Sequence, residues 1–158
     1  MVHSFLGQNE EYLEYVKKYE ARYKTHDETN PSWIFYIGHA YWVNGFKEEA
    51  EYYFDAGLEY YNKLLERDRH FARDIYIFKS LAAMYAFLED KDKAYKYLRR
   101  MNQSQRFPHF EIKDLKNDPL FESIRDEPEF QQIVRDVEAK CQAEHERVRK
   151  WLVENDML

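Results

Sequence analysis

One pattern recurs along the 158-residue chain and restricts its fold more than any other feature. Each copy has an apolar residue, a short turn, a charged stretch, and then a small or aromatic residue followed four positions later by an apolar one. The copies are FLGQNEEYLEYV (Phe5–Val16), VNGFKEEAEYYF (Val43–Phe54) and FLEDKDKAYKYL (Phe87–Leu98). Their turns fall at Gly7, Gly45 and Glu89, so the period is roughly 40 residues, which is typical of helical repeat arrays.

The residues around these turns suit two antiparallel helices in close contact. Gly38 and Ala50 are small where such helices approach, and Phe54 is large enough to fill the space beside them. Gly45 permits the left-handed backbone that ends a helix, whereas Glu89 at the matching turn is a weaker stop. We therefore predict that Gly38 contacts the facing helix near Ala50.

These positions resemble the tetratricopeptide repeat. In that family the first helix carries an aromatic or aliphatic residue, then Leu-Gly, then Tyr, and the second carries Ala, Phe and Ala at spacings of four and three. The resemblance implies an all-α, TPR-like solenoid of helical hairpins that acts as a protein-interaction scaffold. The matching residues are Ile34, Ile37, Gly38, Tyr41, Ala50, Phe54 and Gly57 in one copy, and Phe78, Leu81, Ala82, Tyr85, Ala94, Leu98 and Met101 in the next.

The repeats divide the chain into parts of a single domain. A half repeat cannot bury its apolar face alone, so we expect the chain to be an excerpt of a longer protein. The alternative is a short natural protein whose N-terminal helix is a cap. The expected parts are an N-terminal half repeat over 1–30, a repeat over 31–70 whose second helix runs from about Lys47 to Arg67, a repeat over 71–106, and C-terminal capping helices over 107–158.

Two helix starts follow the repeats. Asp118-Pro119 and Asp126-Glu127-Pro128 each place Pro at a first helical position. They predict a short helix over Pro119–Ile124 and a long one over Glu127–Glu154. Before them we expect Pro108 at or just beyond the last repeat helix, and an irregular segment tied to the core by Phe107, Phe110, Ile112 and Leu115.

The predicted long helix is amphipathic, with one apolar stripe at three-four spacing. We expect its first half to cover the last repeat. The second half either curls onto the repeats or uses Val148, Trp151 and Leu152 for contact in a homodimer or with another domain. The run Leu115–Val134 also resembles the segment that closes tetratricopeptide arrays in bacterial multidomain signalling and transcription-regulator proteins. The stripe is Phe130, Val134, Val137, Cys141, Val148 and Trp151, broken by Glu144.

The resemblance also implies a peptide-binding groove, because first-helix positions of the family contact peptides on the concave surface. The charged clamp of the chaperone-binding branch is missing here, because Phe35 and His39 stand where Lys and Asn are expected. An aromatic groove suits an apolar or amphipathic helix. The alternative is a structural dimerisation or spacer domain whose groove is filled by the chain itself. The expected groove residues are Phe35, His39, Trp42, Tyr76, Lys79 and Phe87.

Composition and motifs argue against several other functions. The net charge of −6 disfavours nucleic-acid binding. No stretch approaches the roughly 20 apolar residues of a membrane helix, and the N-terminus lacks a signal-peptide pattern, so we expect a cytoplasmic protein.

Cys141 and His145 share one helix face but fall short of the four ligands of a closed zinc site. No nucleophile–base grouping, P-loop or glycine triplet occurs, so we expect no enzyme, metal or cofactor. A catalytic or ligand-sensing helical domain lacks motif support.

Overall fold

The computed structural model describes residues 8–23, 34–67, 75–104 and 109–157, and every regular element in these ranges is helical. The prediction of an all-α chain with about seven helices and no sheet is confirmed for this part of the chain. Phe5, Leu6, Gly7, Phe107 and Pro108, on which other predictions rest, lie outside the described residues. The elements are α2 (Asn9–Tyr23), α3 (Ile34–Val43), α4 (Lys47–Glu66), α5 (Ile75–Phe87), α6 (Lys91–Asn102), α7 (His109–Asn117), the 3-10 helix η3 (Pro119–Phe121) and α8 (Pro128–Glu154).

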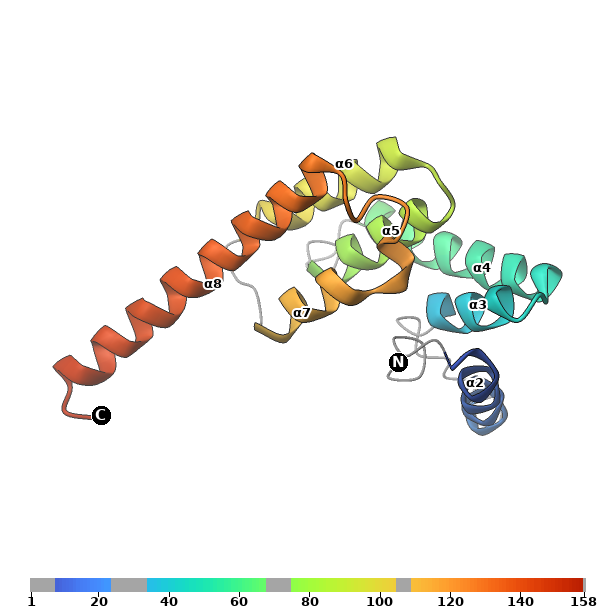
Figure 1. Ribbon diagram of the computed structural model, residues 1–158, viewed down its shortest axis with the longest axis horizontal. Helices are drawn as coiled ribbons and strands as arrows, with labels where there is room; N and C mark the ends of the chain where they lie inside the picture. The colour runs from blue at the N-terminus through green and yellow to red at the C-terminus, as the bar shows by residue number, and fades with distance from the viewer. Residues whose placement is uncertain (1–7, 24–33, 68–74, 105–108, 158) are drawn as a thin grey trace.

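Helices α3 and α4 form one antiparallel hairpin and α5 and α6 form a second (Figure 1). Both turns contain one residue in the left-handed backbone conformation. Gly45 has φ 85° and its N–H donates to Trp42 O at 3.0 Å, while Glu89 has φ 61° and its N–H donates to Ala86 O at 3.1 Å. The left-handed conformation predicted at Gly45 is therefore confirmed, and Glu89 adopts it without being glycine.

Small residues set the distance between α3 and α4. A Cβ added at Gly38 would lie 2.8 Å from Phe54 Cε1 and 3.2 Å from the carbonyl oxygen of Ala50. A Cβ added at Gly57 would lie 2.8 Å from Phe35 Cδ1. The predicted contact of Gly38 with the facing helix near Ala50 is thus confirmed, and a larger residue at either glycine would overpack the crossing.

Helix α2 covers the outer side of α3 and forms a small core of its own with it. Tyr12 and Val16 are buried against Ile37, and the Tyr12 hydroxyl donates to the carbonyl oxygen of Tyr36 at 2.6 Å. The buried carboxylate of Glu20 accepts hydrogen bonds from the hydroxyls of Tyr41 and Tyr53. Because these tyrosines belong to α3 and α4, Glu20 attaches α2 to the whole hairpin.

The segment after the second hairpin is more regular than predicted. The expectation of an irregular stretch is wrong for the described residues 109–117, which form α7. Ile112 and Leu115 are one helical turn apart and both are buried, so the helix gains an apolar face. The expected helix over Pro119–Ile124 is limited to the 3-10 turn η3. Asp118 caps η3 as predicted, because its carboxylate accepts from the N–H of Leu120 at 3.1 Å.

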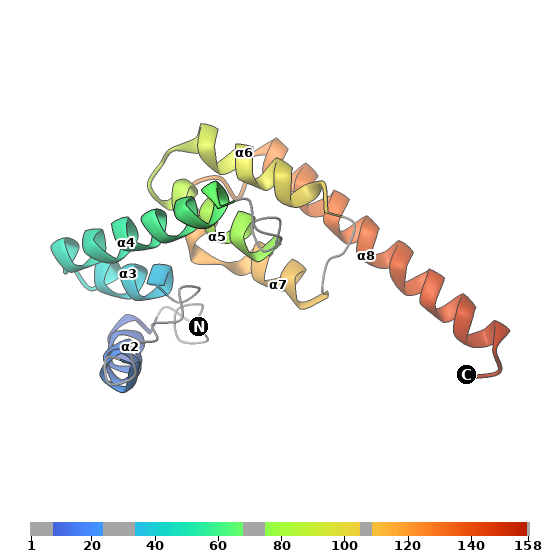
Figure 2. The ribbon, with the colours of Figure 1, turned by 180° about the vertical axis from the view of Figure 1, so that it is seen from behind.

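Helix α8 has 27 residues and divides into two halves. The first half packs on α6 and α7 through Phe130, Ile133, Val134 and Val137, as predicted. Polar contacts reinforce this docking, including the bidentate pair of Arg99 with Glu129 at 2.7 and 3.0 Å. Figure 1 and Figure 2 show the second half extending away from the other helices. Among the helices described, none combines the length and apolarity that a bilayer-crossing segment needs.

Candidate functional site

The predicted groove residues do not share one open surface. Phe35 is only 1% exposed, stacks on Tyr61 with ring centroids 5.2 Å apart, and belongs to the main core. His39 is only 6% exposed and lies between the rings of Tyr12 and Phe87. The assignment of Phe35 and His39 to an accessible groove is therefore wrong. Helix α3 is apolar on nearly every side, and α2 and α4 cover the two sides that carry these residues.

The remaining groove residues have different surroundings. Trp42 is half-buried, with its ring 5.5 Å from that of Phe87, which is also half-buried, and with the Lys47 ammonium 5.1 Å above the indole. Tyr76 is exposed near the start of α5. Lys79 is half-buried and forms an ion pair of 3.9 Å with Asp114 of α7. Only Tyr76 of the predicted set thus lies on an exposed position.

The segment from α7 to Ser123, just beyond η3, lies against α3 and α5 and makes polar contacts with both helices. The Tyr36 hydroxyl donates to Asp118 Oδ2 at 2.8 Å, and the Ser123 hydroxyl donates to the carbonyl oxygen of Ala86 at 2.6 Å. The Lys79–Asp114 ion pair is another contact between this segment and α5. The chain's own C-terminal segment therefore covers part of the face that the resemblance assigned to a peptide.

Two buried groups on this face, Asp118 and His39, have pKa values that differ from those of the free side chains. Burial raises the pKa of Asp118 above that of an ordinary carboxyl, although its hydrogen bonds from Leu120 and Tyr36 oppose the shift. Burial lowers the pKa of His39 to about 4. Within the described residues His39 Nδ1 has no hydrogen-bond partner, so its neutral form is strongly favoured. The Asp118 carboxylate caps η3, and His39 lies between the rings of Tyr12 and Phe87, so both groups take part in the packing of the fold.

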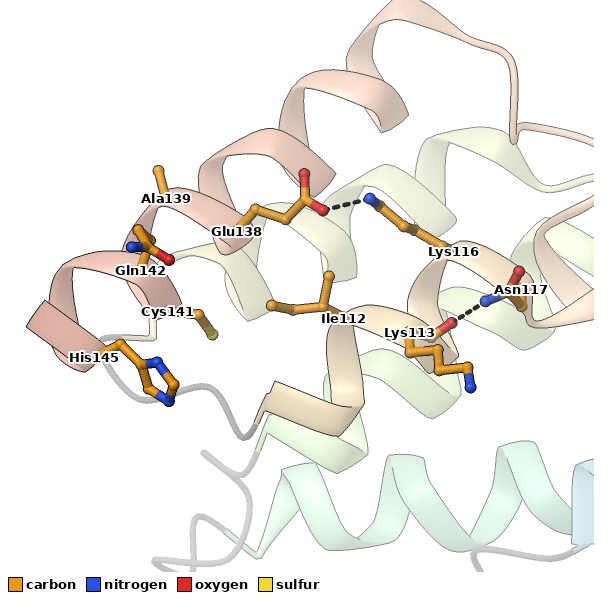
Figure 3. A pocket seen from close by; sticks show the side chains of 9 residues that line it. All are labelled: Ile112, Lys113, Lys116, Asn117, Glu138, Ala139, Cys141, Gln142 and His145. Carbon is orange, nitrogen blue, oxygen red and sulfur yellow. Dashed lines mark hydrogen bonds and ion pairs between the residues drawn. The ribbon is translucent and has the colours of Figure 1, made fainter.

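An open pocket of about 920 Å³ lies elsewhere, between α7 and α8. Figure 3 shows Ile112 of α7 and Cys141 of α8 on its apolar side, with an ion pair between Lys116 and Glu138 at one edge. Burial raises the pKa of the Cys141 thiol, so the thiol form is favoured over the reactive thiolate. The lining residues are Ile112, Lys113, Lys116, Asn117, Glu138, Ala139, Cys141, Gln142 and His145.

Beyond this pocket the apolar stripe of α8 continues onto solvent. Val148 is 41% exposed and Trp151 is 52% exposed, while Leu152 is half-buried. The expectation that these residues are available for an interhelical contact agrees with their exposure, and the alternative in which this half curls onto the repeats is absent from the structure described. We call the pocket together with the exposed stripe over residues 142–157 the C-terminal surface.

The pocket was not predicted from the sequence, because helix α7, which forms one of its walls, was not predicted either. Ile112 and Leu115, three positions apart among charged residues, are a signal for a helix, and the prediction of an irregular segment does not use it. No group of three or more His, Cys, Asp or Glu side chains able to hold a metal occurs in the described ranges. Comparison with protein-family models, with curated proteins and with solved structures gives no match for this chain. Its function must therefore be argued from this geometry.

Proposed function

We propose that this protein is a non-catalytic protein-interaction scaffold of the tetratricopeptide type, and that its partner binds the C-terminal surface. The repeated hairpins support the first part. Gly45 and Glu89 have matching left-handed turns, and Gly38 and Gly57 stand at the helix crossing where the family has small residues. The resemblance of the closing segment supports a regulatory protein of bacteria, working in the cytoplasm, with these residues as its C-terminal module.

The observation that carries the proposal is the exposure of the second half of α8. A stripe that is buried in the first half continues into Val148 and Trp151, which are exposed. Large aromatic side chains that are accessible in the free protein are frequent anchors of protein interfaces. The pocket lies nearer the start of α8, where its lining ends at His145, and it adds an apolar recess to the surface that could receive an apolar or amphipathic helix.

A structural dimerisation or spacer domain is the second candidate, and one observation favours it. The face expected to bind a peptide is partly covered by the segment from α7 to just beyond η3, through Asp114, Asp118 and Ser123. In that case the hairpins serve mainly to hold α8 in place. Both candidates assign the external contact to the same C-terminal surface.

Photo-crosslinking tests the proposed surface. A benzophenone amino acid is placed at position 151, or at position 52 as a matched control, because Tyr52 is an aromatic residue 68% exposed on α4. Irradiation in the cells that express the protein should give discrete protein adducts from position 151 and none from position 52. Equal and diffuse labelling at both positions would contradict an interaction function for the C-terminal surface.

A further inference from the structure

Helix α6 is strongly basic in a chain whose net charge is −6. Five of its 12 residues are basic and only Asp92 is acidic. On the side that faces α8 (Figure 2), Lys91 pairs with Glu127 at 2.5 Å. On the same side Arg99 pairs with Glu129 at 2.7 Å. The positive charge of that side is therefore neutralised within the molecule.

The other three basic residues of α6 lie on its opposite side, because an α-helix has about 3.6 residues per turn. They are Lys93, Lys96 and Arg100, and all three are exposed. Lys93 pairs with Asp90 at 2.7 Å. Lys96 and Arg100 have no carboxylate partner in the part of the chain that the structure describes. Two positive charges, about one helical turn apart, thus remain uncompensated on this side.

Aromatic rings lie beside both uncompensated cations. The Lys96 ammonium is 5.4 Å from the centre of the Tyr97 ring. The Arg100 guanidinium is 5.8 Å from the centre of the Phe78 ring. The Tyr97 ring also stacks on Tyr85, with centroids 5.8 Å apart and planes at 7°. Cation–π contacts restrict long side chains, so less conformational entropy is lost when these cations bind an anion.

Two tyrosine hydroxyls add hydrogen-bond donors to this side of α6. Among the described residues the Tyr85 and Tyr97 hydroxyls have no hydrogen-bond partner, and both oxygens keep contact with solvent. Burial raises the pKa of Tyr97, and the positive charges of Arg100 and Lys93 oppose that shift, so the hydroxyl lies close to both cations. A protonated phenol can donate to an anion. This side therefore combines two uncompensated cations with two hydroxyl donors.

We infer that this side of α6 binds a phosphate monoester carried by a phosphorylated peptide of a partner protein. A phosphoserine has a charge of about −1.5 to −2 and three acceptor oxygens, which match two cations and two hydroxyl donors. A carboxylate has one charge and two oxygens, so it would leave part of the surface unsatisfied. Because the cations are exposed, a free phosphate gains little, whereas a peptide adds contacts around the phosphate.

Capture on phosphopeptide beads tests this site, which lies on the side of α6 opposite α8 and is therefore separate from the C-terminal surface. The beads carry degenerate peptides with a fixed central phosphoserine, and matched sets carry serine or glutamate at that position. The purified full chain should bind the phosphoserine set at least tenfold more strongly than either matched set.

Two double variants remove the same number of positive charges from opposite sides of α6. Lys96→Gln with Arg100→Gln should lower capture by the phosphoserine set at least tenfold. Lys91→Gln with Arg99→Gln is the control and should retain capture within twofold, because it removes cations already paired with α8. Circular dichroism should show unchanged helicity in both variants, because all four side chains are exposed.

A third variant tests the hydroxyl donors. Tyr97→Phe keeps the stacked ring and removes the hydroxyl, so it should weaken capture by the phosphoserine set severalfold. Tyr52→Phe is the control, since Tyr52 is an exposed tyrosine on α4, and it should leave capture unchanged.

Three results would overturn the inference. One is a wild-type chain that does not distinguish phosphoserine from serine. Another is equal capture by the glutamate set, which would assign this side of α6 to carboxylates. The third is an equal loss of capture in both double variants, which would reflect overall charge alone. None of these measurements involves position 151, so the crosslinking test of the C-terminal surface is decided separately.

Discussion

At the scale of single residues, the two hairpin turns differ in how easily they form. Both require a left-handed residue, and a residue with a Cβ pays roughly 1–2 kcal/mol for that conformation while glycine does not. Gly45 meets nothing within 4 Å of a Cβ added to it, so its role is conformational rather than steric. Glu89 has an exposed side chain and adopts the same conformation at φ 61°.

We therefore predict that Glu89→Gly stabilises the fold by about 1 kcal/mol, since it relieves this backbone cost. Urea unfolding measures the change in the free energy of unfolding. Glu89→Ala is the control, because it removes the carboxylate and keeps the Cβ, and it should leave the stability nearly unchanged. A gain of equal size from Glu89→Ala would show that the charge, not the backbone, is responsible.

His39 is the second residue whose surroundings lower the stability of the fold, in this case at acidic pH. Its pKa falls from 6.5 to about 4 because burial disfavours the imidazolium. Between these values the unfolded chain binds a proton that the folded chain does not, so stability rises with pH across this window and is lost as pH falls from about 6.5 toward 4. The full effect is of the order of 3 kcal/mol at the acidic end.

We predict that His39→Leu removes this part of the pH dependence. Chemical unfolding between pH 4 and 7 should show a smaller loss of stability on acidification in the variant than in the wild type. The comparison is of slopes, so a constant packing cost of the substitution does not affect it. Parallel curves for the two proteins would contradict the assignment of a neutral buried His39.

At the scale of elements, the contact between Tyr36 and Asp118 joins α3 to the start of η3. Asp118 is only 1% exposed, and its carboxylate accepts from both Tyr36 and the N–H of Leu120. Hydrogen bonds to charged groups contribute about 1.5–3 kcal/mol, and a buried partner left unsatisfied costs more than an exposed one. This contact should therefore hold the C-terminal segment on the hairpins.

A double-mutant cycle tests the contact. Tyr36→Phe should lower the free energy of unfolding by about 1.5–3 kcal/mol, and Asp118→Asn should cost a comparable amount. The double variant should lose less than the sum, because the two substitutions remove one interaction. Tyr52→Phe is the control, since Tyr52 is exposed, and it should be neutral. Strict additivity of the pair would mean that the two side chains do not interact in solution.

At the scale of the whole molecule, the described helices have two cores of unequal size. The larger joins both hairpins to η3 and the first half of α8, and the smaller joins α2 to α3 through Tyr12, Leu13 and Val16. Elements with few buried apolar contacts unfold locally at a lower free-energy cost than the elements of the main core. Helix α2 should therefore be the less stable unit.

We predict that hydrogen exchange separates these units. Amides of α2 should exchange at least tenfold faster than those of α5, which lies in the larger core. Val16→Ala should raise exchange in α2 further and leave α5 unchanged, because Val16 contributes only to the smaller core. Equal protection of α2 and α5, with equal sensitivity to Val16→Ala, would show that the chain unfolds as one unit.

The local sequence alone determined the helical hairpins, their glycine crossings and the limits of α4 and α8. The helix limits depend on residues a few positions apart, such as Gly45 after the end of α3 or Glu127 with Pro128 at the start of α8, whose preferences act along the chain. Only the tertiary structure decided that Phe35 and His39 are buried, that α7 and η3 cover the face expected to bind a peptide, and that a pocket opens beside Cys141. These facts depend on which helix lies against which. A repeat pattern predicts which face of a helix carries a side chain. Whether that side chain is exposed also depends on which distant segments of the chain pack over that face.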